Sequence, residues 1–427
     1  MADTKITERY EFKTDIITAW DGHEQRIKTR QLPRHFLTYD YSAMNAYQAQ
    51  WLKGMNRIRQ SDLYYIPMWH NPAYLAEDFV ENGKALYIEK EYMYNFYECD
   101  WIEIFFHDDF NQTSNIVREV SGYSDGIIRL KKKIERPLLK LNTWIFPLHQ
   151  VSVQPSNSID YLYSNGSEVS MSFEDLCKPS KTSIPYKYRV EYFEDVKDFN
   201  EFHLPLIHNN REVFAISPQW LDDNSNVLDI NKNTNKLDNE TGLFVYDLKN
   251  TSTYDVHTLS LYLINHKLIS NTIKFFIRMG GMYKSFYCPT WANDFEVDRY
   301  VLAGTNFLYT KFSNLYKFYA GNGRRKSIVI FTKDRQSYIF DIMSYSYEVI
   351  GGTRYGKLTL AQTIPRSFGV RDILMVSYFN LVRFDSDSLK LDYESNIVAG
   401  VDLAMREVDD DLCVLIRMKL LYKMLSP

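Results

Sequence analysis

The sequence predicts a mostly β fold with minor α content. It is expected to form two tandem, related β-barrel or β-sandwich modules from an internal duplication, each with one helix. Aromatic residues make up 15% of the 427 residues, and 33 residues are tyrosine; aromatic and β-branched side chains favour strands. Residues 65–97 also align without a gap on residues 287–319, with nine of the 33 positions identical, whereas unrelated segments share about two.

The identical positions follow two patterns, Y-x-P-x-W-x-N and Y-x-F-Y, made mostly of residues that anchor packing. Weaker matches extend the repeat on both sides. Residues 38–40 resemble residues 253–255, and residues 130–134 resemble residues 360–364. The nine identical pairs are Tyr65/Tyr287, Pro67/Pro289, Trp69/Trp291, Asn71/Asn293, Leu86/Leu308, Tyr87/Tyr309, Tyr94/Tyr316, Phe96/Phe318 and Tyr97/Tyr319.

One helix is expected near the start of the chain. Ser42 is a capping residue, and the apolar residues after it recur at steps of three and four, as on one face of a helix: Met44, Tyr47, Trp51, Met55 and Ile58. The register of the repeat places residues 273–277 of the second module over the end of this helix. Strands are expected at residues 101–106, 242–247, 300–302 and 327–332.

The repeat divides the chain into four parts: a first module (residues 1–155), a connector (156–205), a second module (206–405) and a C-terminal extension (406–427). Ser-, Asn- and Pro-rich turns surround short strand-like pieces in the connector. Residues 229–242 are the most polar stretch and are expected to form a hairpin tip or exposed loop. In the extension, acidic residues 409–411 precede an apolar run, a pattern typical of a helix with favourable charge at its N-terminus.

Composition favours a soluble globular protein, since charged residues make up 24% of the chain and the formal net charge is −4. This bulk charge implies no polyanion-binding surface, and no apolar run is long enough to span a membrane. The first residues lack the apolar core of a secretion signal. The cysteines lie far apart and form neither a metal signature nor a disulfide framework, which favours synthesis in a reducing cytoplasm: Cys99, Cys177, Cys288 and Cys413.

Several patterns with chemical potential are better explained as ordinary structure. Residues 321–327 (GNGRRKS) lack P-loop spacing and precede a strand rather than a helix, so a hairpin turn is expected. Residues 107–109 (HDD) could hold a cation or act as acid and base, but a polar turn is favoured. Residues 131–133 (KKK) could contact nucleic acid, but a solvated strand face is favoured.

Three histidines, His203, His208 and His257, sit singly in the sequence, without a carboxylate or cysteine at ligand spacing. No G-x-S-x-G signature occurs. The sequence therefore predicts no catalytic, cofactor-binding or metal-binding residue, and a protein that is not an enzyme.

Several segments resemble the distal-tail and hub proteins of tailed bacteriophages. The opening carries EFKTDIITAWDG at residues 11–22, then EQR at 24–26, RQLPR at 30–34 and FLTYD at 36–40. In that family a strand and a Gly turn precede E-x-R, and a second strand carries a P-R pair before a helix. YCPTWAND at residues 287–294 and VRFDSD at 382–387 are similar to other recurring segments of phage virion proteins. The second module has no clear E-x-R and P-R pair.

The resemblance implies a structural protein of the tail tip or baseplate that acts by assembly. Phage tails stack six-fold rings above a tip that is commonly three-fold. A trimer of duplicated chains would offer six similar modules as a pseudo-hexameric ring between tube and tip, closed by heterologous interfaces. The implied partners are further copies of the chain, the tail tube protein and other tail-tip proteins, with passive contact to DNA in the lumen. The implied location is the virion, after assembly in the host cytoplasm.

Three alternatives stay open at this point. The first is a distal-tail ring of six subunits. The second is a receptor- or carbohydrate-binding tail protein, for which an exposed aromatic patch would be the sign. The third is a depolymerising enzyme, which would need two carboxylates about 5 to 10 Å apart in an aromatic cleft.

Overall fold

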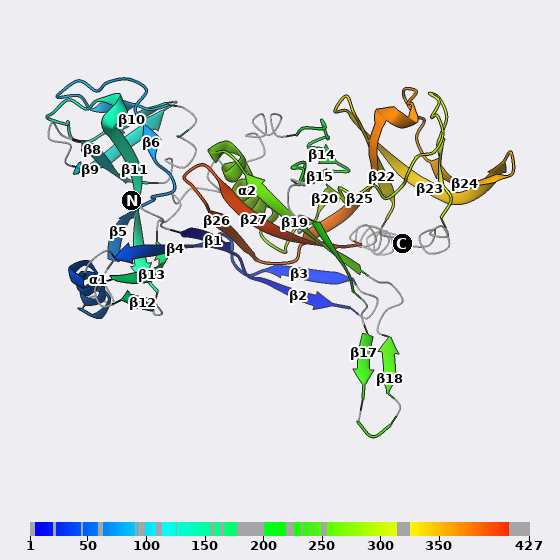
Figure 1. Cartoon of the computed structure of the whole chain (residues 1–427), viewed down its shortest axis with the longest axis horizontal. Helices are drawn as coiled ribbons and strands as arrows, with labels where there is room; N and C mark the ends of the chain where they lie inside the picture. The colour runs from blue at the N-terminus through cyan, green and yellow to red at the C-terminus, as the bar shows by residue number, and fades with distance from the viewer. Residues whose placement is uncertain are drawn as a thin grey trace, which may run out of the picture.

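Within the residues that the structure describes, the chain folds as antiparallel β structure with two α-helices (Figure 1). The structure is a computed structural model. The structure describes residues 5–19, 23–43, 46–58, 63–89, 92, 99–107, 113–124, 126–154, 158–163, 166–176, 200–218, 226–231, 234–238, 240–242, 244–248, 254–313 and 325–409.

The described part of the first half contains the helix α1 and a run of strands. Its elements are β1 (Ile6–Glu11), β2 (Thr14–Thr18), β3 (Glu24–Lys28), β4 (Arg34–Ala43), α1 (Ala46–Ile58), β5 (Leu63–Pro67), β6 (Ala73–Tyr74), β7 (Ala85–Tyr87), β8 (Trp101–His107), β9 (Thr113–Ser124), β10 (Ile127–Leu130), β11 (Thr143–Val153), β12 (Ser158–Tyr163) and β13 (Gly166–Asp175).

The second half begins with a short hairpin and then follows the same order. Its elements are β14 (Ile207–His208), β15 (Arg211–Glu212), β16 (Asn226–Asn231), β17 (Thr234–Leu237), β18 (Val245–Leu248), β19 (Tyr254–Leu263), α2 (His266–Met279), β20 (Phe286–Pro289), β21 (Phe307–Lys311), β22 (Ser327–Thr332), β23 (Ser337–Ile350), β24 (Thr353–Leu360), β25 (Ile373–Phe384), β26 (Ser388–Tyr393) and β27 (Ala399–Glu407).

The two halves use the same strand pairings in the same chain order. β1 pairs with β4 as β16 pairs with β19, and the registers correspond. Ile6 lies opposite Tyr39, and Asn226 lies opposite Leu259. Asn226 therefore follows Ile6 by the same number of residues as Leu259 follows Tyr39. The hairpins β2–β3 and β17–β18 and the starts of α1 and α2 keep this displacement.

Strand pairings further along the chain correspond as well, but there the equivalent residues of the two halves are slightly further apart in the sequence. β12 and β13 of the first half correspond to β26 and β27 of the second. Tyr161 of β12 lies opposite Ser167, and Tyr393 of β26 lies opposite Ala399. The outer sheets repeat the set β7–β10, β9–β10, β8–β9, β8–β11 and β5–β11 as β21–β24, β23–β24, β22–β23, β22–β25 and β20–β25.

One strand joins the halves. β1 pairs with β4 along one edge and with β26 of the second half along the other, where Ile6 lies opposite Tyr393 and Glu11 opposite Ser388. A continuous antiparallel sheet results, in the order β12–β13–β4–β1–β26–β27–β19–β16. Figure 1 shows the outer sheets on either side of this central sheet.

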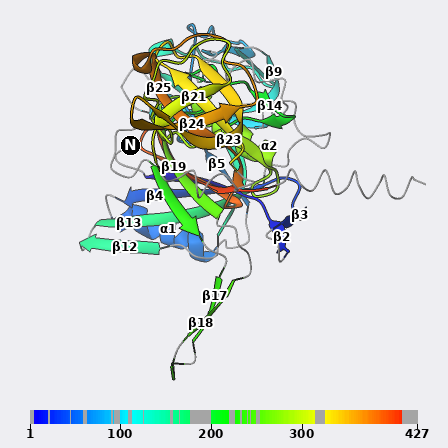
Figure 2. The same cartoon turned by 90° about the vertical axis from the view of Figure 1, so that its right-hand side faces the viewer.

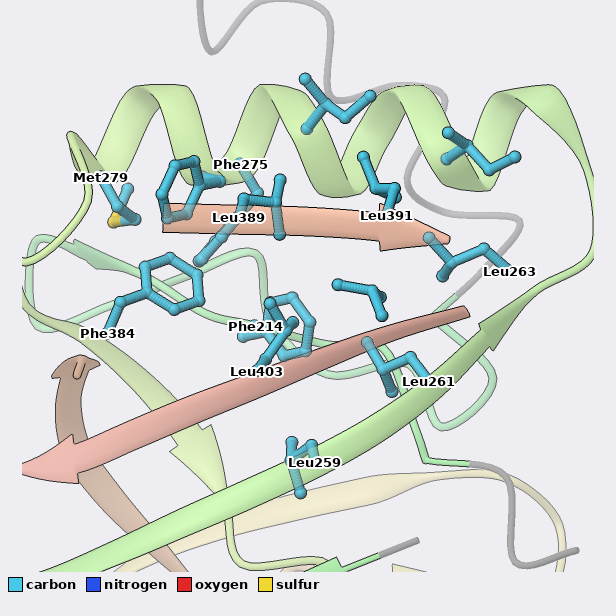
Figure 3. Close-up of a cluster of buried hydrophobic side chains, with 14 of the residues drawn as sticks. Phe214, Leu259, Leu261, Leu263, Phe275, Met279, Phe384, Leu389, Leu391 and Leu403 are labelled. Carbon is cyan, nitrogen blue, oxygen red and sulfur yellow. The ribbon is translucent and has the colours of Figure 1, made fainter. Parts of the chain in front are cut away.

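The hydrophobic core is divided in the same way as the sheets, into one central cluster and two outer clusters. A central cluster of buried hydrophobic side chains draws on both halves, and α2 packs there over β19, β26 and β27 (Figure 3). The side chain of Asn265 accepts the Leu268 amide at 2.7 Å and so caps the start of α2, while Gly280 ends the helix at φ 69°. Each outer sheet encloses a smaller cluster, one around Ile104 and one around Ile330.

The mostly β fold is confirmed, but the predicted closed barrels are not. Among the strands described, β6 and β7 are joined only by the single bridge Leu75–Ile88, whose residues directly follow the two strands, and the corresponding contact of the second half is the bridge Val297–Thr310. β6 has two residues, too few to continue a ladder of hydrogen bonds. The chain therefore forms a large antiparallel sheet rather than two closed barrels.

The remaining predictions concern individual helices and strands. α1 and α2 cover the segments where helices were expected, but the prediction that Ser42 caps the first helix is wrong, because Ser42 lies in β4 and pairs with Glu168 of β13. Residues 101–106 and 327–332 are strands. Residues 300–302 form only a bridge at Val301. Residues 131–133 are not a strand either: 131 and 132 form a bend after β10, because the chain turns there toward the bridge Phe79–Leu138. β12 and β13 lie within the predicted connector, where β12 pairs with β13 and β13 pairs in turn with β4 and β11. The expected helix after residue 411 lies outside the described residues.

Candidate functional site: the joint between the halves

The joint, formed by β1 and the β2–β3 hairpin against the second half, contains a buried carboxylate. Glu8 of β1 is 3% exposed. The hydroxyl of Tyr393 on β26 donates to its Oε2 at 2.6 Å, and the hydroxyl of Tyr10 donates to its Oε1 at 2.7 Å. Nε2 of His35 lies 2.7 Å from the same Oε1. The carboxylate is therefore satisfied by both halves of the chain at once.

Glu8 belongs to a group of buried polar side chains, called here the first polar cluster: Glu8, His35, His70, His149 and Asp175. Nδ1 of His35 lies 2.8 Å from Oδ2 of Asp175, and Nδ1 of His149 lies 2.6 Å from the same oxygen. The strands β4, β11 and β13 bring these three side chains together.

Charge attraction outweighs burial in the first polar cluster. Burial alone would lower the pKa of His35, but hydrogen bonds to Asp175 and Glu8 raise it to about 10. Burial would raise the pKa of Glu8, but attraction to His70 and hydrogen bonds from His35 hold it well below its usual value. His35 is thus an imidazolium that links two carboxylates at neutral pH.

The β2–β3 hairpin contacts the second half through an ion pair. Nε of Arg383 lies 2.8 Å from Oε2 of Glu24, and its second guanidinium nitrogen lies 2.8 Å from Oε1. Arg383 is 1% exposed, and it also contacts Asp385 at 3.0 Å. Glu24 belongs to the E-x-R motif and Arg383 to the VRFDSD segment, so two segments that carried the family resemblance meet here.

A second contact of the hairpin surrounds Asp387. This carboxylate accepts the Thr14 hydroxyl at 2.9 Å and the Met282 amide at 2.9 Å. The adjacent Gly281 adopts φ 64°, and a Cβ there would collide with Asp387. The Phe12 ring packs on Phe276 of α2 with centroids 5.8 Å apart. The turn between β1 and β2 therefore lies against the C-terminal end of α2.

The corresponding place in the second half holds a second polar cluster: Asp255, His257, Arg325, Asn380 and Glu407. Arg325 pairs with Asp255 and, at 3.2 Å, with Oε1 of Glu407. The amide of Asn380 donates to the same oxygen at 2.6 Å. Register places Asp255, Asn380 and Glu407 at the positions that His35, His149 and Asp175 occupy in the first half.

Each cluster contains three groups that could ligate a metal, with ligand atoms within 4.8 Å of one another: His35, His149 and Asp175 in one, and Asp255, His257 and Glu407 in the other. In both, however, a cation of the protein itself balances the carboxylates, His35 in the first and Arg325 in the second. The arrangement is that of an ion-pair network buried between strands.

His257, which sits singly in the sequence, lies near a carboxylate in the structure. Its Nε2 lies 3.8 Å from Oε1 of Glu407. The sequence could not indicate this contact, because Glu407 lies on β27, far along the chain. Within the described part of the chain, His203 and His208 belong to neither cluster: the carbonyl of His203 accepts from Ser337, and the ring of His208 packs edge-on to Tyr287.

The other chemically suggestive sequence patterns do not converge on the joint. His107 ends β8 and packs edge-on to Trp144, and residues 108–109 lie outside the described part. Lys131 pairs with Glu119 on the surface, and Lys133 donates to the side chain of Asn82. Of the GNGRRKS segment only its end is described, where Arg325 belongs to the second polar cluster.

The Y-x-P-x-W-x-N segments have a packing role. Tyr65 and Pro67 pair with β11 in the same register in which Tyr287 and Pro289 pair with β25. Trp291 is 1% exposed and stacks on Phe331. Trp291 and Phe331 both belong to the central cluster, so this contact packs β22 of the second outer sheet against it.

Two further sequence predictions concern the cysteines and membrane-spanning segments. Cys99 and Cys288 are buried free thiols, and burial raises the pKa of Cys99 to about 12. Within the described part of the chain, neither helix has the length and apolar character needed to cross a membrane.

Comparison with known proteins identifies no family. No family model matches the chain, and no curated protein matches it. Among solved structures, two variants of Bacillus subtilis oxalate decarboxylase align over 94% of this chain and 77% of their own, with 7% and 8% identity and TM-scores of 0.10 and 0.09. At that level of likeness these structures carry no argument about fold or activity.

Proposed function

We propose that this chain is an internally duplicated structural protein of a phage tail tip or baseplate, and that it acts by assembly rather than catalysis. The strand pairings of the two halves, which match in order and in register, support the duplication. The matched positions include the two polar clusters, which differ in side chains but not in place. Old duplicates retain topology while their side chains diverge.

The observation that carries the proposal is the joint itself. Two similar halves meet edge to edge through β1 and β26, and not face to face. Such a contact is heterologous, because each half uses a different edge, and repetition of a heterologous contact generates a ring when its rotation closes. Three chains would then supply six similar modules, a pseudo-hexameric ring able to join a six-fold tail tube to a three-fold tip.

The proposal assigns the protein to the virion, with assembly in the host cytoplasm. Its partners would be further copies of the chain, the tail tube protein and other tail-tip proteins. DNA would pass the lumen of the ring with passive contact only.

The test is the mass of the purified chain by light scattering, alone and with tail tube protein, together with negative-stain images. Trimers with six lobes are expected. Rings of six chains would replace the trimeric hub by a distal-tail ring. A chain that stays monomeric with tail components present would refute both, and a glycan-binding assay would then test the receptor-binding and depolymerase alternatives.

A further inference from the structure

We infer that β16 of one copy pairs antiparallel with β12 of the next copy, so that the central sheet continues from subunit to subunit. This inference rests on the proposed assembly and specifies its interface. It follows from the internal joint, because β16 is the counterpart of β1 and β12 is the counterpart of β26. The chain thus contains one example of the contact, between β1 and β26. It also has, at the two edges of the central sheet, one further strand of each type: β16, which corresponds to β1, and β12, which corresponds to β26.

The two edges concerned are open. Within the described residues, β16 pairs only with β19 and β12 only with β13, and an open edge presents unpaired N–H and C=O groups. The side chains of β16 differ from those of β1 in exposure. Leu228 is 48% exposed, whereas its counterpart Glu8 is 3% exposed under β26; Ile230 is 66% exposed. An edge strand with exposed apolar residues is suited to burial.

The hairpin beside β16 is uncovered as well. β2–β3 lies against the second half, but its counterpart β17–β18 projects from the body of the chain (Figure 2). Three of its apolar side chains are more than half exposed: Leu237, Val245 and Tyr246. In the neighbouring copy this hairpin would contact the first half, as β2–β3 contacts the second.

The helix facing that position also exposes apolar side chains. α2 is buried at nearly every position and carries the turn after β1 at its end, whereas α1 exposes Tyr47 (77%) and Trp51 (56%). The counterpart of Trp51 is Asn271, which is 9% exposed. A second copy would therefore cover an edge strand and a hairpin, as the internal joint does, and would bring its turn to the end of α1 as the turn after β1 lies at the end of α2.

The internal joint also sets the register. Thr7 lies opposite Asp392 and Glu8 opposite Leu391. When each of these residues is replaced by its counterpart in the other half, Val227 lies opposite Asp160 and Leu228 opposite Ile159. A shift by one residue would turn the side chains to the other face, so the register can be tested directly.

Cysteine cross-linking tests the interface. Cys177 and Cys413 are replaced by Ser, while the buried Cys99 and Cys288 are kept. The variant Val227→Cys/Asp160→Cys is expected to form disulfide-linked multimers on mild oxidation, ending at the trimer. The matched variant Thr7→Cys/Asp392→Cys should close its disulfide within one chain and stay at monomer mass on a denaturing gel.

Register and energetics have their own controls. Val227→Cys/Ser158→Cys, displaced by two residues, is expected to cross-link much less than the matched pair. Leu228→Lys should weaken self-association at least roughly tenfold, because it places a charge in a buried edge. Val349→Lys, on an exposed position of β23 that the interface does not use, should leave association unchanged.

The outcomes separate the two proposals. Trimers that fail to cross-link through Val227→Cys/Asp160→Cys, while the Thr7→Cys/Asp392→Cys pair closes, would overturn the interface and leave the trimeric assembly standing. Equal cross-linking of the displaced pair would overturn the register. A chain that remains monomeric with tube protein present would overturn the interface together with the proposed function.

Discussion

The ion pair between Arg383 and Glu24 allows a direct test of what holds the β2–β3 hairpin on the second half. We consider Arg383→Met, which keeps much of the side-chain volume and removes the guanidinium. The variant deletes two hydrogen bonds of 2.8 Å to Glu24, one of 2.8 Å to the Phe384 carbonyl and one of 3.0 Å to Asp385. It leaves the carboxylate of Glu24 in a largely buried place with fewer cations around it.

Removal of one partner from a buried pair costs about 3–5 kcal/mol. The lower value applies here, because Arg26 at 3.1 Å and Arg406 at 3.9 Å remain near Glu24. A cost of about 3 kcal/mol corresponds to roughly a 150-fold rise in the population of the detached hairpin, since 1.4 kcal/mol is a factor of ten. Glu24→Gln/Arg383→Met should recover only part of this cost, because it removes the buried carboxylate charge together with the guanidinium but also removes the ion pair of Arg26 with Glu24.

Hydrogen exchange read by mass spectrometry measures the effect. Amides of residues 14–28 should exchange about two orders of magnitude faster in Arg383→Met, while those of β17–β18 stay unchanged. Arg354→Met, at an exposed arginine of β24, is the matched control. Unchanged exchange in residues 14–28, or an equal rise in both hairpins, would show that the ion pair does not hold the joint.

Three further changes test the packing and charge described above. Gly281→Ala should destabilise the fold by about 1–3 kcal/mol more than Gly304→Ala in urea denaturation, because both have positive φ but only Gly281 lies against Asp387; equal costs would remove the steric argument. Trp291→Ala should cost about 3–5 kcal/mol in the same assay, and a loss under about 1 kcal/mol would contradict its role as an anchor. The pKa of His35, raised to about 10, means that its stabilising contribution is complete below pH 6.5 and disappears as pH rises through 10. His35→Gln should therefore flatten the fall in melting temperature between pH 7 and 10.5, and an unchanged slope would refute the ion-pair account.

Much of the fold could be predicted from local patterns. β8 alternates buried Ile102, Ile104 and Phe106 with partly exposed neighbours, which is the period of a half-buried strand. The sequence register that aligns Tyr65 with Tyr287 also agrees with the strand pairings. Large packing residues at fixed positions give a signal that a comparison of two segments can detect.

The upstream register was not predictable in the same way. The sequence match aligned Thr38 with Thr253, whereas the strand pairings make Thr258 its counterpart. β4 and β19 share a pattern of buried and exposed faces rather than identical residues, and many side chains satisfy such a pattern. A chance match of three residues then outweighs the alignment that the pairings give.

The polar clusters were missed for a related reason. Asp255 and Glu407 meet because β19 pairs with β27, and nothing near either residue in the sequence indicates that pairing. The same holds for Glu8 and Tyr393 across the joint. Contacts made by strand pairing between distant parts of the chain are set by topology. They cannot be predicted from the charged residues that are near one another in the sequence.

The pairing of β1 with β26 has a consequence for biosynthesis. About 380 residues separate the partners, so at 5–20 residues per second the ribosome needs roughly 20–80 s to deliver the second after the first. Throughout that interval β1 can bind β4 while its other edge waits. Closure of the chain is therefore a late event of translation, and crowded polysomes are where a neighbouring nascent chain could supply the missing strand and produce a domain-swapped dimer.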